Sequence, residues 1–357
     1  MGINKWIAHE HVKKENTLNL LCFIFDGGSA SYFAPWKYKI SDDINLIPIL
    51  YPAREKRREE KMYENMEVFL EKLVVSLEKI FRGQYAFFGY CSGAVLAYET
   101  AALARALYGT EPVYGMIISS EAPEYLPGTV PVCTDQNKEE LFYSHMSGLP
   151  TISKEMLHDK VFLNYYAPLI TSDYDLLRTY SYREHEKFTC DFDVVMSPED
   201  EKVERKKIEE WGKLTDGATT IFEKPGGHFL VESQAEFIFD RLNSRLSEKE
   251  KYNMKFSEVP QKEAETEHND IEKKMIDIWK KILQTDEITL ADSFFLKGGD
   301  SIKAARIVNA VKEEMGVSID ISDIIKNPEI STLSNYISDL LENEKSMTDS
   351  DMDEGEI

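Results

Sequence analysis

Short apolar runs alternate with helical patterns along the first 246 residues of this chain. The apolar runs have the length and the aliphatic or β-branched content of buried strands, and they cover residues 18–25, 46–50, 85–89, 115–120, 192–196 and 219–223. Between them, apolar residues recur at helical spacing in 62–81, 92–107, 203–214 and 233–246. This alternation predicts a mainly parallel sheet that is covered by helices on both faces.

Other parts of the chain depart from this alternation. Residues 135–187 are helical in pattern and rich in Tyr and Leu, which predicts a helical insertion, either a lid over a site or a structural subdomain. Residues 269–342 have no strand pattern, and helical periods there predict a small four-helix bundle. The polar stretch 247–268 predicts a linker between two domains, 1–246 and 269–342, and the acidic end 343–357 predicts a disordered tail.

Composition narrows the classes of function. The 357 residues include 42 Lys and Arg against 64 Asp and Glu, and this net charge of −22 disfavours sequence-independent binding to nucleic acid. No apolar run is long enough to span a membrane, and residues 18–25 lack the basic flank and cleavage site of a signal peptide. Four sparse cysteines without a CxxC pair predict a cytoplasmic protein and give no sign of a metal site.

The segment Gly89-Tyr90-Cys91-Ser92-Gly93 has the pattern glycine, any residue, nucleophile, any residue, glycine. It follows a predicted strand and opens a predicted helix, which is the setting that a nucleophile elbow requires. At a helix N-terminus, the dipole and a neighbouring imidazolium would lower the pKa of a thiol. The pattern therefore predicts Cys91 as a nucleophile, against the alternative of a buried structural cysteine in a glycine-containing turn.

A nucleophile of this kind needs a base and an orienting acid later in the chain. His228 lies in the glycine-rich loop KPGGHFLVES after the last predicted strand, and it is the predicted base. The acid is predicted after the preceding strand as Asp200, with Glu199 as the alternative; Asp200 could also serve only as a helix cap. The oxyanion hole is predicted from the backbone amides of Asp26 and Ser92.

Four segments, FIFDGGSASYFAPW, IPILYPAREKRREE, FFGYCSGAVLAYE and PGGHFLVE, resemble the external (type II) thioesterases of nonribosomal peptide and polyketide assembly lines. The resemblance covers about residues 17–245. It implies an α/β-hydrolase fold with a helical lid, a nucleophile-His-Asp triad that supports Asp200, and a substrate held as a thioester on a carrier domain. The chain departs from the family at Cys91, where the family has serine, at Asp26, where a small residue is usual, and at 197–198, where the family has Gly-Asp.

The segment DSFFLKGGDSIKAARIV resembles the signature of peptidyl carrier domains, and the likeness extends over about residues 271–337. It implies that Ser301 carries 4′-phosphopantetheine as a phosphodiester, with Asp300 as the acidic neighbour typical of the signature. A serine that opens a helix suits a phosphate, because the helix dipole and free amides stabilise the negative charge. The implied partners are carrier and adenylation domains of a synthetase, and a phosphopantetheinyl transferase.

Cysteine changes the chemistry that the family resemblance implies. Transfer of an acyl group from a carrier thiol to Cys91 exchanges one thioester for another, so that the acyl group stays activated. The chain could hydrolyse carrier-bound acyl groups, transfer them to a thiol or amine acceptor or release them by cyclisation, or act as a non-catalytic docking module for its carrier domain. Asp26 could orient the nucleophile, bind an amino group of the substrate, or serve only in a turn.

Overall fold

The computed structural model describes residues 4–8, 18–134, 136–149, 152–247, 270–283, 285, 288–290, 292, 294, 297, 301–320, 323–324, 327 and 329–350. Of these, the side chains of residues 270, 301, 302, 305 and 342–350 are not described. The chain divides into two compact units, an N-terminal one formed almost wholly by residues before 258 and a C-terminal one formed mainly by residues from 258 onward. The residues expected to form the linker lie almost entirely outside the described part, so the domain limits stay a prediction.

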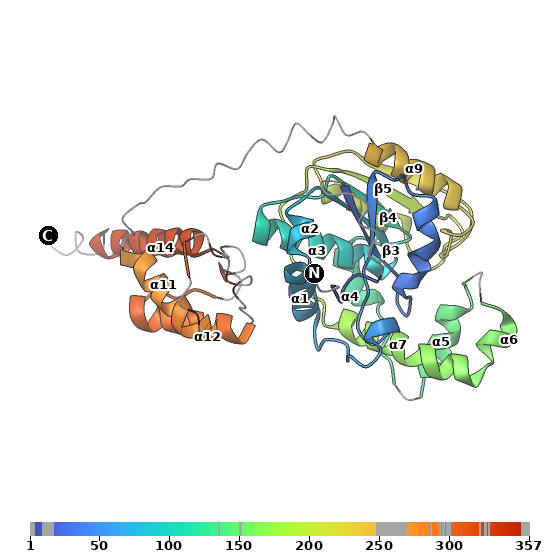
Figure 1. Ribbon diagram of the computed structural model, residues 1–357, viewed down its shortest axis with the longest axis horizontal. Coiled ribbons are helices and arrows are strands. Elements are labelled where there is room, and N and C mark those ends of the chain that lie inside the picture. Colours follow the sequence, from blue (N-terminus) through green and yellow to red (C-terminus); the bar gives the residue numbers. More distant parts are fainter. Residues whose placement is uncertain are drawn as a thin grey trace. The chain divides into compact units, whose positions relative to one another are not determined.

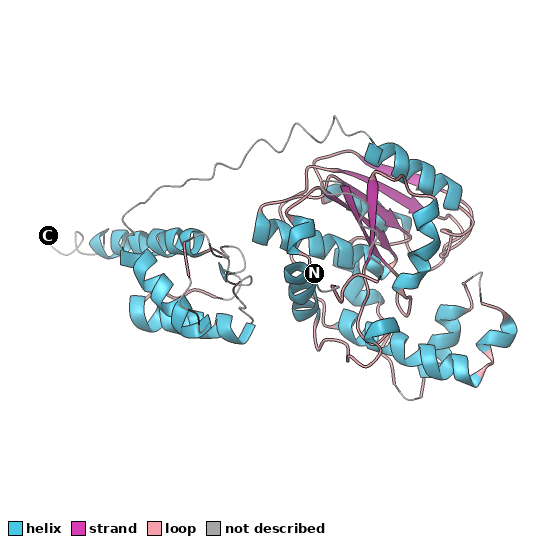
Figure 2. Cartoon of the chain, in the orientation of Figure 1, coloured by secondary structure: helices cyan, strands magenta, loops and turns pink. Residues whose placement is uncertain are grey.

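A six-stranded sheet forms the centre of the N-terminal unit (Figure 2). Its strands are β1 (Leu18–Phe23), β2 (Ile44–Pro48), β3 (Tyr85–Tyr90), β4 (Tyr114–Ile118), β5 (Asp191–Met196) and β6 (Thr219–Glu223). The spatial order is β2-β1-β3-β4-β5-β6, and every neighbouring pair is parallel. Each of the six predicted strands is thus confirmed, as is the α/β-hydrolase fold.

Helices cover both faces of the sheet, with α3 and α9 on opposite sides (Figure 1). The α-helices of this layer are α1 (Met66–Ser76), α2 (Glu78–Phe81), α3 (Ser92–Tyr108), α4 (Leu126–Thr129), α8 (Arg205–Glu209) and α9 (Ala235–Ser247). Four 3₁₀ segments join them: η1 (Ala30–Tyr38), η2 (Glu55–Arg57), η3 (Pro123–Tyr125) and η4 (Glu210–Lys213). Because both faces are covered, the inner strands β3 and β4 are buried along their whole length, which explains why they have no polar alternation.

The helical insertion between β4 and β5 contains α5 (Lys138–Met146), α6 (Lys154–Leu157) and α7 (Lys160–Arg178), which we call the lid. The Asp159 carboxylate caps α7 by accepting a hydrogen bond from the amide of Val161 at 2.6 Å. The inner side of α7 buries Leu169, Ile170, Leu176 and Leu177. The lid therefore packs on the rest of the unit through an apolar helix face, and its role over the site stays a prediction.

The C-terminal unit contains α11 (Asp270–Leu283), α12 (Ser301–Met315) and α14 (Ile330–Ser350), with a short helical turn at 323–324. The Trp279 ring packs edge-on against Phe294 at 5.3 Å between centroids, and Ile307, Val311 and Leu333 are fully buried. The all-helical prediction is confirmed, but the predicted disordered tail is wrong in part. Helix α14 continues to Ser350, because the sequence from 330 to 350 has no glycine or proline to end it; residues 351–357 lie outside the described part.

None of the helices in the described part of the chain combines the length and the apolar character that a membrane crossing needs.

Candidate active site

The turn from β3 into α3 holds Cys91 in a strained backbone conformation, with φ at 54°. A Cβ atom on Gly89 would lie 2.3 Å from the Cα of Ala94, and one on Gly93 would lie 2.6 Å from the carbonyl oxygen of Phe23. Both contacts are too short for any side chain, so the two glycines allow the strand and the helix to approach. The turn therefore has the geometry of a nucleophile elbow, which presents Cys91 at the N-terminus of α3.

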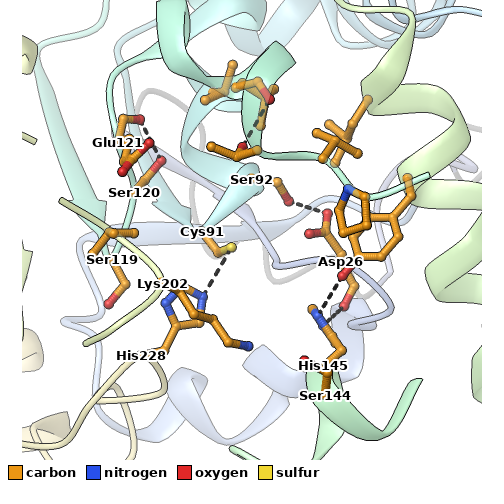
Figure 3. Close-up of a pocket in the computed structure, with 18 of the residues that line it drawn as sticks. Asp26, Cys91, Ser92, Ser119, Ser120, Glu121, Ser144, His145, Lys202 and His228 are labelled. Carbon is orange, nitrogen blue, oxygen red and sulfur yellow. Dashed lines mark hydrogen bonds between the residues drawn. The ribbon is translucent and has the colours of Figure 1, made fainter. Parts of the chain in front are cut away.

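Cys91, His228 and Asp200 are joined by hydrogen-bond contacts, and Figure 3 shows the first of them. His228 Nε2 lies 3.3 Å from Cys91 Sγ, and His228 Nδ1 lies 2.8 Å from Asp200 Oδ2. An ionised carboxylate only accepts, so Nδ1 carries the hydrogen and Nε2 presents its lone pair to the thiol. The structure thus brings together the three residues predicted from the sequence, in the order of contacts that a nucleophile, base and acid require.

The acid loop after β5 separates Asp200 from its alternative, Glu199. Asp200 contacts the imidazole, whereas Glu199 Oε2 accepts a hydrogen bond from the amide of Gly226 at 3.1 Å. Asp200 Oδ1 also accepts from the amide of Lys202 at 2.9 Å, which fixes the carboxylate. The geometry therefore favours Asp200 over Glu199 as the partner of His228, while the catalytic roles stay a prediction.

The loop after β1 places Asp26 next to Ser92, as the prediction of an oxyanion hole requires. The Ser92 hydroxyl donates a hydrogen bond to Asp26 Oδ1 at 2.5 Å. The next residue, Gly27, has a φ of 70°, and its amide donates to Asp173 Oδ2 of the lid helix α7 at 2.7 Å. The buried guanidinium of Arg54 pairs with the same carboxylate. The loop is therefore held from the lid side, and the use of the Asp26 and Ser92 amides as oxyanion donors stays a prediction.

His145 of α5 is a site residue that the sequence reasoning missed. Its Nε2 lies 2.6 Å from the carbonyl oxygen of Asp26, and its Nδ1 lies 3.2 Å from the hydroxyl of Tyr174 (Figure 3 shows the first contact). Burial lowers the pKa of His145 to about 3, so the ring is neutral, with its hydrogen on Nε2 because a carbonyl only accepts. A lone histidine in a helix, 119 residues from its partner, has no sequence signal that would reveal this contact.

The pKa of Cys91 contradicts the expectation of a lowered value. Burial raises the pKa of the thiol above its ordinary value, and the nearby Asp26 carboxylate raises it further. The backbone amide of Ser92 and the charge of Lys202 oppose this without reversing it. A preformed thiolate at Cys91 is therefore disfavoured, and His228 Nε2, 3.3 Å from the sulfur, is positioned to accept the thiol proton.

The carboxyl group of Asp26 is itself perturbed. Burial raises its pKa from the ordinary value to about 7, the neighbouring Asp173 contributes in the same direction, and the Ser92 hydroxyl opposes it. Asp26 therefore gains its negative charge as the pH rises through about 7, and that charge then disfavours the Cys91 thiolate.

We expect Asp26→Asn to lower the pKa of Cys91, since it removes this negative charge without changing the size of the side chain. Alkylation of Cys91 by iodoacetamide should become roughly three- to tenfold faster above pH 8, because one pKa unit is a factor of ten in thiolate. Below pH 6, where the Asp26 carboxyl group is protonated, the two proteins should react alike. Peptide mass spectrometry measures the rates, with the partly exposed Cys133 as internal reference; equal rates above pH 8 would contradict the assigned coupling.

A cavity of about 330 Å³ opens beside Cys91 and is lined by lid, loop and sheet-edge residues. Its apolar wall includes Val95, Leu126, Leu141 and Leu177, and its polar wall includes Asp26, Ser119, Glu121, His145 and Lys202. Within the described residues, no three His, Cys, Asp or Glu side chains are grouped so as to hold a metal ion. The site is thus a partly open pocket around a thiol, with a volume in the range of small-molecule sites.

Comparison with known proteins gives the site a context. The thioesterase domain family matches residues 19–246, and the phosphopantetheine attachment site family matches residues 273–337. Thioesterase PikA5 of Streptomyces venezuelae is 28% identical over 242 residues, which are 68% of this chain and 85% of the relative. The gramicidin S biosynthesis protein GrsT of Aneurinibacillus migulanus is 26% identical over 241 residues, 66% of this chain and 92% of the relative.

Solved structures show the same fold. The type II thioesterase BorB from the borrelidin biosynthetic cluster superposes with a TM-score of 0.57 at 23% identity, over 65% of this chain and 94% of that one. At that level of identity the likeness concerns the fold alone. The two matched families divide the predicted functional residues, since Cys91, Asp200 and His228 fall in the first segment and Ser301 in the second.

Proposed function

The chain belongs to the thioesterase family and carries a phosphopantetheine attachment domain, and from this premise we propose that it processes acyl thioesters through an acyl-enzyme on Cys91. Its substrates are acyl groups held on carrier domains in nonribosomal peptide or polyketide biosynthesis. The observation that carries the proposal is the chain of contacts from Cys91 Sγ through His228 to Asp200. A docking module without catalysis would have no need of this arrangement.

The first step forms the acyl-enzyme. His228 Nε2 takes the proton of Cys91 as the sulfur attacks the carbonyl carbon of the substrate thioester, and Asp200 stabilises the resulting imidazolium. The amides of Asp26 and Ser92 are the proposed donors to the oxyanion that develops. The bond between the carbonyl carbon and the carrier sulfur then breaks, and His228 returns the proton to the departing thiol.

The second step releases the acyl group from Cys91. His228 takes a proton from the acceptor, which is water, an amine or a second thiol, and the acceptor forms its bond to the carbonyl carbon as the bond to Cys91 Sγ breaks. The proton then passes from His228 to the Cys91 sulfur. Since the acyl-enzyme is a thioester, transfer of the acyl group to a thiol acceptor changes the free energy little, and an amine acceptor reacts readily with it.

The carrier domain, proposed as residues 269–342, supplies Ser301 for 4′-phosphopantetheine. Ser301 is the first residue of α12, and the backbone amides at a helix N-terminus favour a phosphate. When bound, the group supplies the thiol on which acyl groups are held. The proposed partners are a phosphopantetheinyl transferase and the carrier and adenylation domains of a synthetase. The proposed linker, residues 247–268, would let the carrier domain reach these partners.

The product of the second step is decided by supplying acceptors separately. Acyl-phosphopantetheine is loaded onto Ser301, and the intact mass is followed with time under three conditions. These are water alone, an added amine, and an added separate carrier domain that bears phosphopantetheine with a free thiol and no acyl group. Loss of the acyl group in water alone identifies a hydrolase, and loss only with an acceptor identifies an acyltransferase. Equal behaviour of the protein and its Cys91→Ala variant under all three conditions would overturn the proposed function.

A further inference from the structure

We propose that the cavity beside Cys91 takes an acyl group with a protonated α-amino group, so that the preferred substrates are aminoacyl thioesters. The inference deepens the proposed function and rests on it. The group that would bind the ammonium is the side-chain carboxylate of Asp26, which is distinct from the backbone amide proposed as an oxyanion donor.

The Asp26 carboxylate is buried, bound on one side and open on the other. Only 8% of the residue is exposed, and Oδ1 accepts the hydrogen bond from Ser92. Oδ2 has no hydrogen-bond or ion-pair partner among the residues that the structure describes, and Asp26 lines the cavity. Figure 3 shows the carboxylate on the side of the cavity that faces Cys91. A carboxylate oxygen in this setting is stabilised by a cationic donor that enters with the substrate.

The neighbouring charged groups leave this role to Asp26. Arg54 pairs with Asp173 behind the loop. Lys202 lies over the ring of Phe229, 5.3 Å from its centroid, and among the described ion pairs none joins Lys202 to Asp26. The other acidic group of the cavity, Glu121, accepts a hydrogen bond from the amide of Glu204 at 2.8 Å and forms an ion pair with Lys207 at 3.5 Å, both through Oε1, while its Oε2 is buried without a hydrogen-bond partner. Among the described residues, Asp26 is thus the acidic side chain of the cavity that has no ion-pair partner, whereas the charge of Glu121 is already paired with Lys207.

The position of Asp26 selects the α-carbon of the acyl group. The reacting carbonyl oxygen is proposed to lie at the Asp26 amide, and the carboxylate of the same residue is only a few bonds from that amide. A nitrogen on the carbon next to the reacting carbonyl therefore lies within reach of the carboxylate. Glu121 lies on the other side of Cys91 in Figure 3, so an amino group bound there would belong to a more distant part of the substrate.

The test compares glycyl and propionyl thioesters of N-acetylcysteamine, in which an ammonium group replaces a methyl group of similar size. In the full-length protein, kcat/KM is expected to be at least about tenfold higher for the glycyl thioester, since a charged hydrogen bond in a buried site discriminates by about that factor or more. Asp26→Asn should lower this ratio at least about tenfold. The Cys91→Ala variant gives the background rate of each thioester.

Three matched variants separate a specific effect from damage to the site. Glu121→Gln removes the same charge elsewhere in the cavity and should leave the glycyl-to-propionyl ratio unchanged. Ser92→Ala keeps the Asp26 carboxylate, and Asp26→Glu keeps a carboxylate at position 26. Both variants should retain the preference whatever their absolute rates. Thermal unfolding shows whether each variant folds. If Asp26→Asn does not fold, the glycyl-to-propionyl ratios of kcat/KM for the unmodified protein and for Asp26→Glu test the inference instead.

The inference is overturned if the unmodified protein shows no preference for the glycyl thioester, or if Asp26→Asn leaves the preference intact. Turnover of both thioesters that depends on Cys91 but shows no preference would refute the aminoacyl specificity and leave the proposed function standing. No Cys91-dependent turnover of either thioester would refute both together.

Discussion

Replacing Cys91 with alanine is expected to lower the rate of acyl release by at least about 10³-fold, because the acyl-enzyme can no longer form. The residual rate reflects direct attack of the acceptor on the substrate thioester, helped only by substrate binding and by the oxyanion donors. The rate is measured as release of thiol from an acyl thioester of N-acetylcysteamine, with the reagent that detects thiols kept in a separate quench because it would also modify Cys91. Alanine is small and leaves the elbow glycines untouched, so the fold should be preserved.

Two companion variants make this result specific. Cys133→Ala removes another partly exposed thiol and should keep the rate of the unmodified protein. Cys91→Ser should retain some activity, since a hydroxyl beside His228 can form an oxygen ester, but transfer to thiols should fall more than hydrolysis because the intermediate is no longer a thioester. If Cys91→Ala keeps more than about a tenth of the activity, the nucleophile has been assigned wrongly.

Ser301→Ala is expected to abolish attachment of 4′-phosphopantetheine completely, because alanine has no hydroxyl to form the phosphodiester. The measurement is the intact mass of the full-length protein after incubation with coenzyme A and a phosphopantetheinyl transferase. The matched control is Ser331→Ala, which removes a serine in the first turn of α14 in the same domain and should leave loading unchanged. Loading of the Ser301→Ala variant would place the attachment at another residue.

The same variant separates the two domains in function. Because Cys91 lies in the other unit, Ser301→Ala should still turn over small acyl thioesters supplied in solution. Loss of that activity in a folded variant would mean that the thioesterase chemistry itself requires the carrier serine, and would contradict the separation of the two functions.

Much of the fold could be predicted because it follows from local patterns. The strands are short apolar runs, and buried parallel strands have no other sequence requirement. The elbow could be predicted because Gly89 and Gly93 are needed wherever a strand turns so tightly into a helix. Asp200 and His228 could be placed because each follows a strand whose carboxyl end meets the same edge of the sheet as Cys91.

The electrostatic part of the site could not be predicted, because it depends on contacts between distant segments. The amide of Gly27 reaches Asp173 across 146 positions of the chain, and Arg54 joins the same cluster from a third segment. The motif around Cys91 indicates a helix N-terminus but carries no information on burial. Burial of the thiol and the nearby Asp26 carboxylate both raise the pKa of Cys91. The shift is therefore opposite to the lowered pKa that the motif predicted.

If Cys91 carries the acyl group, the intact mass of the Ser301→Ala protein shortly after mixing with a small acyl thioester should reveal it. With the carrier serine absent, a mass increase of one acyl group has to come from elsewhere in the chain, and peptide fragmentation locates it. We expect a single acyl group on Cys91, and no adduct when Cys91 is also replaced by alanine. Turnover without any adduct on Cys91 at early times, or an adduct on another residue, would contradict this expectation.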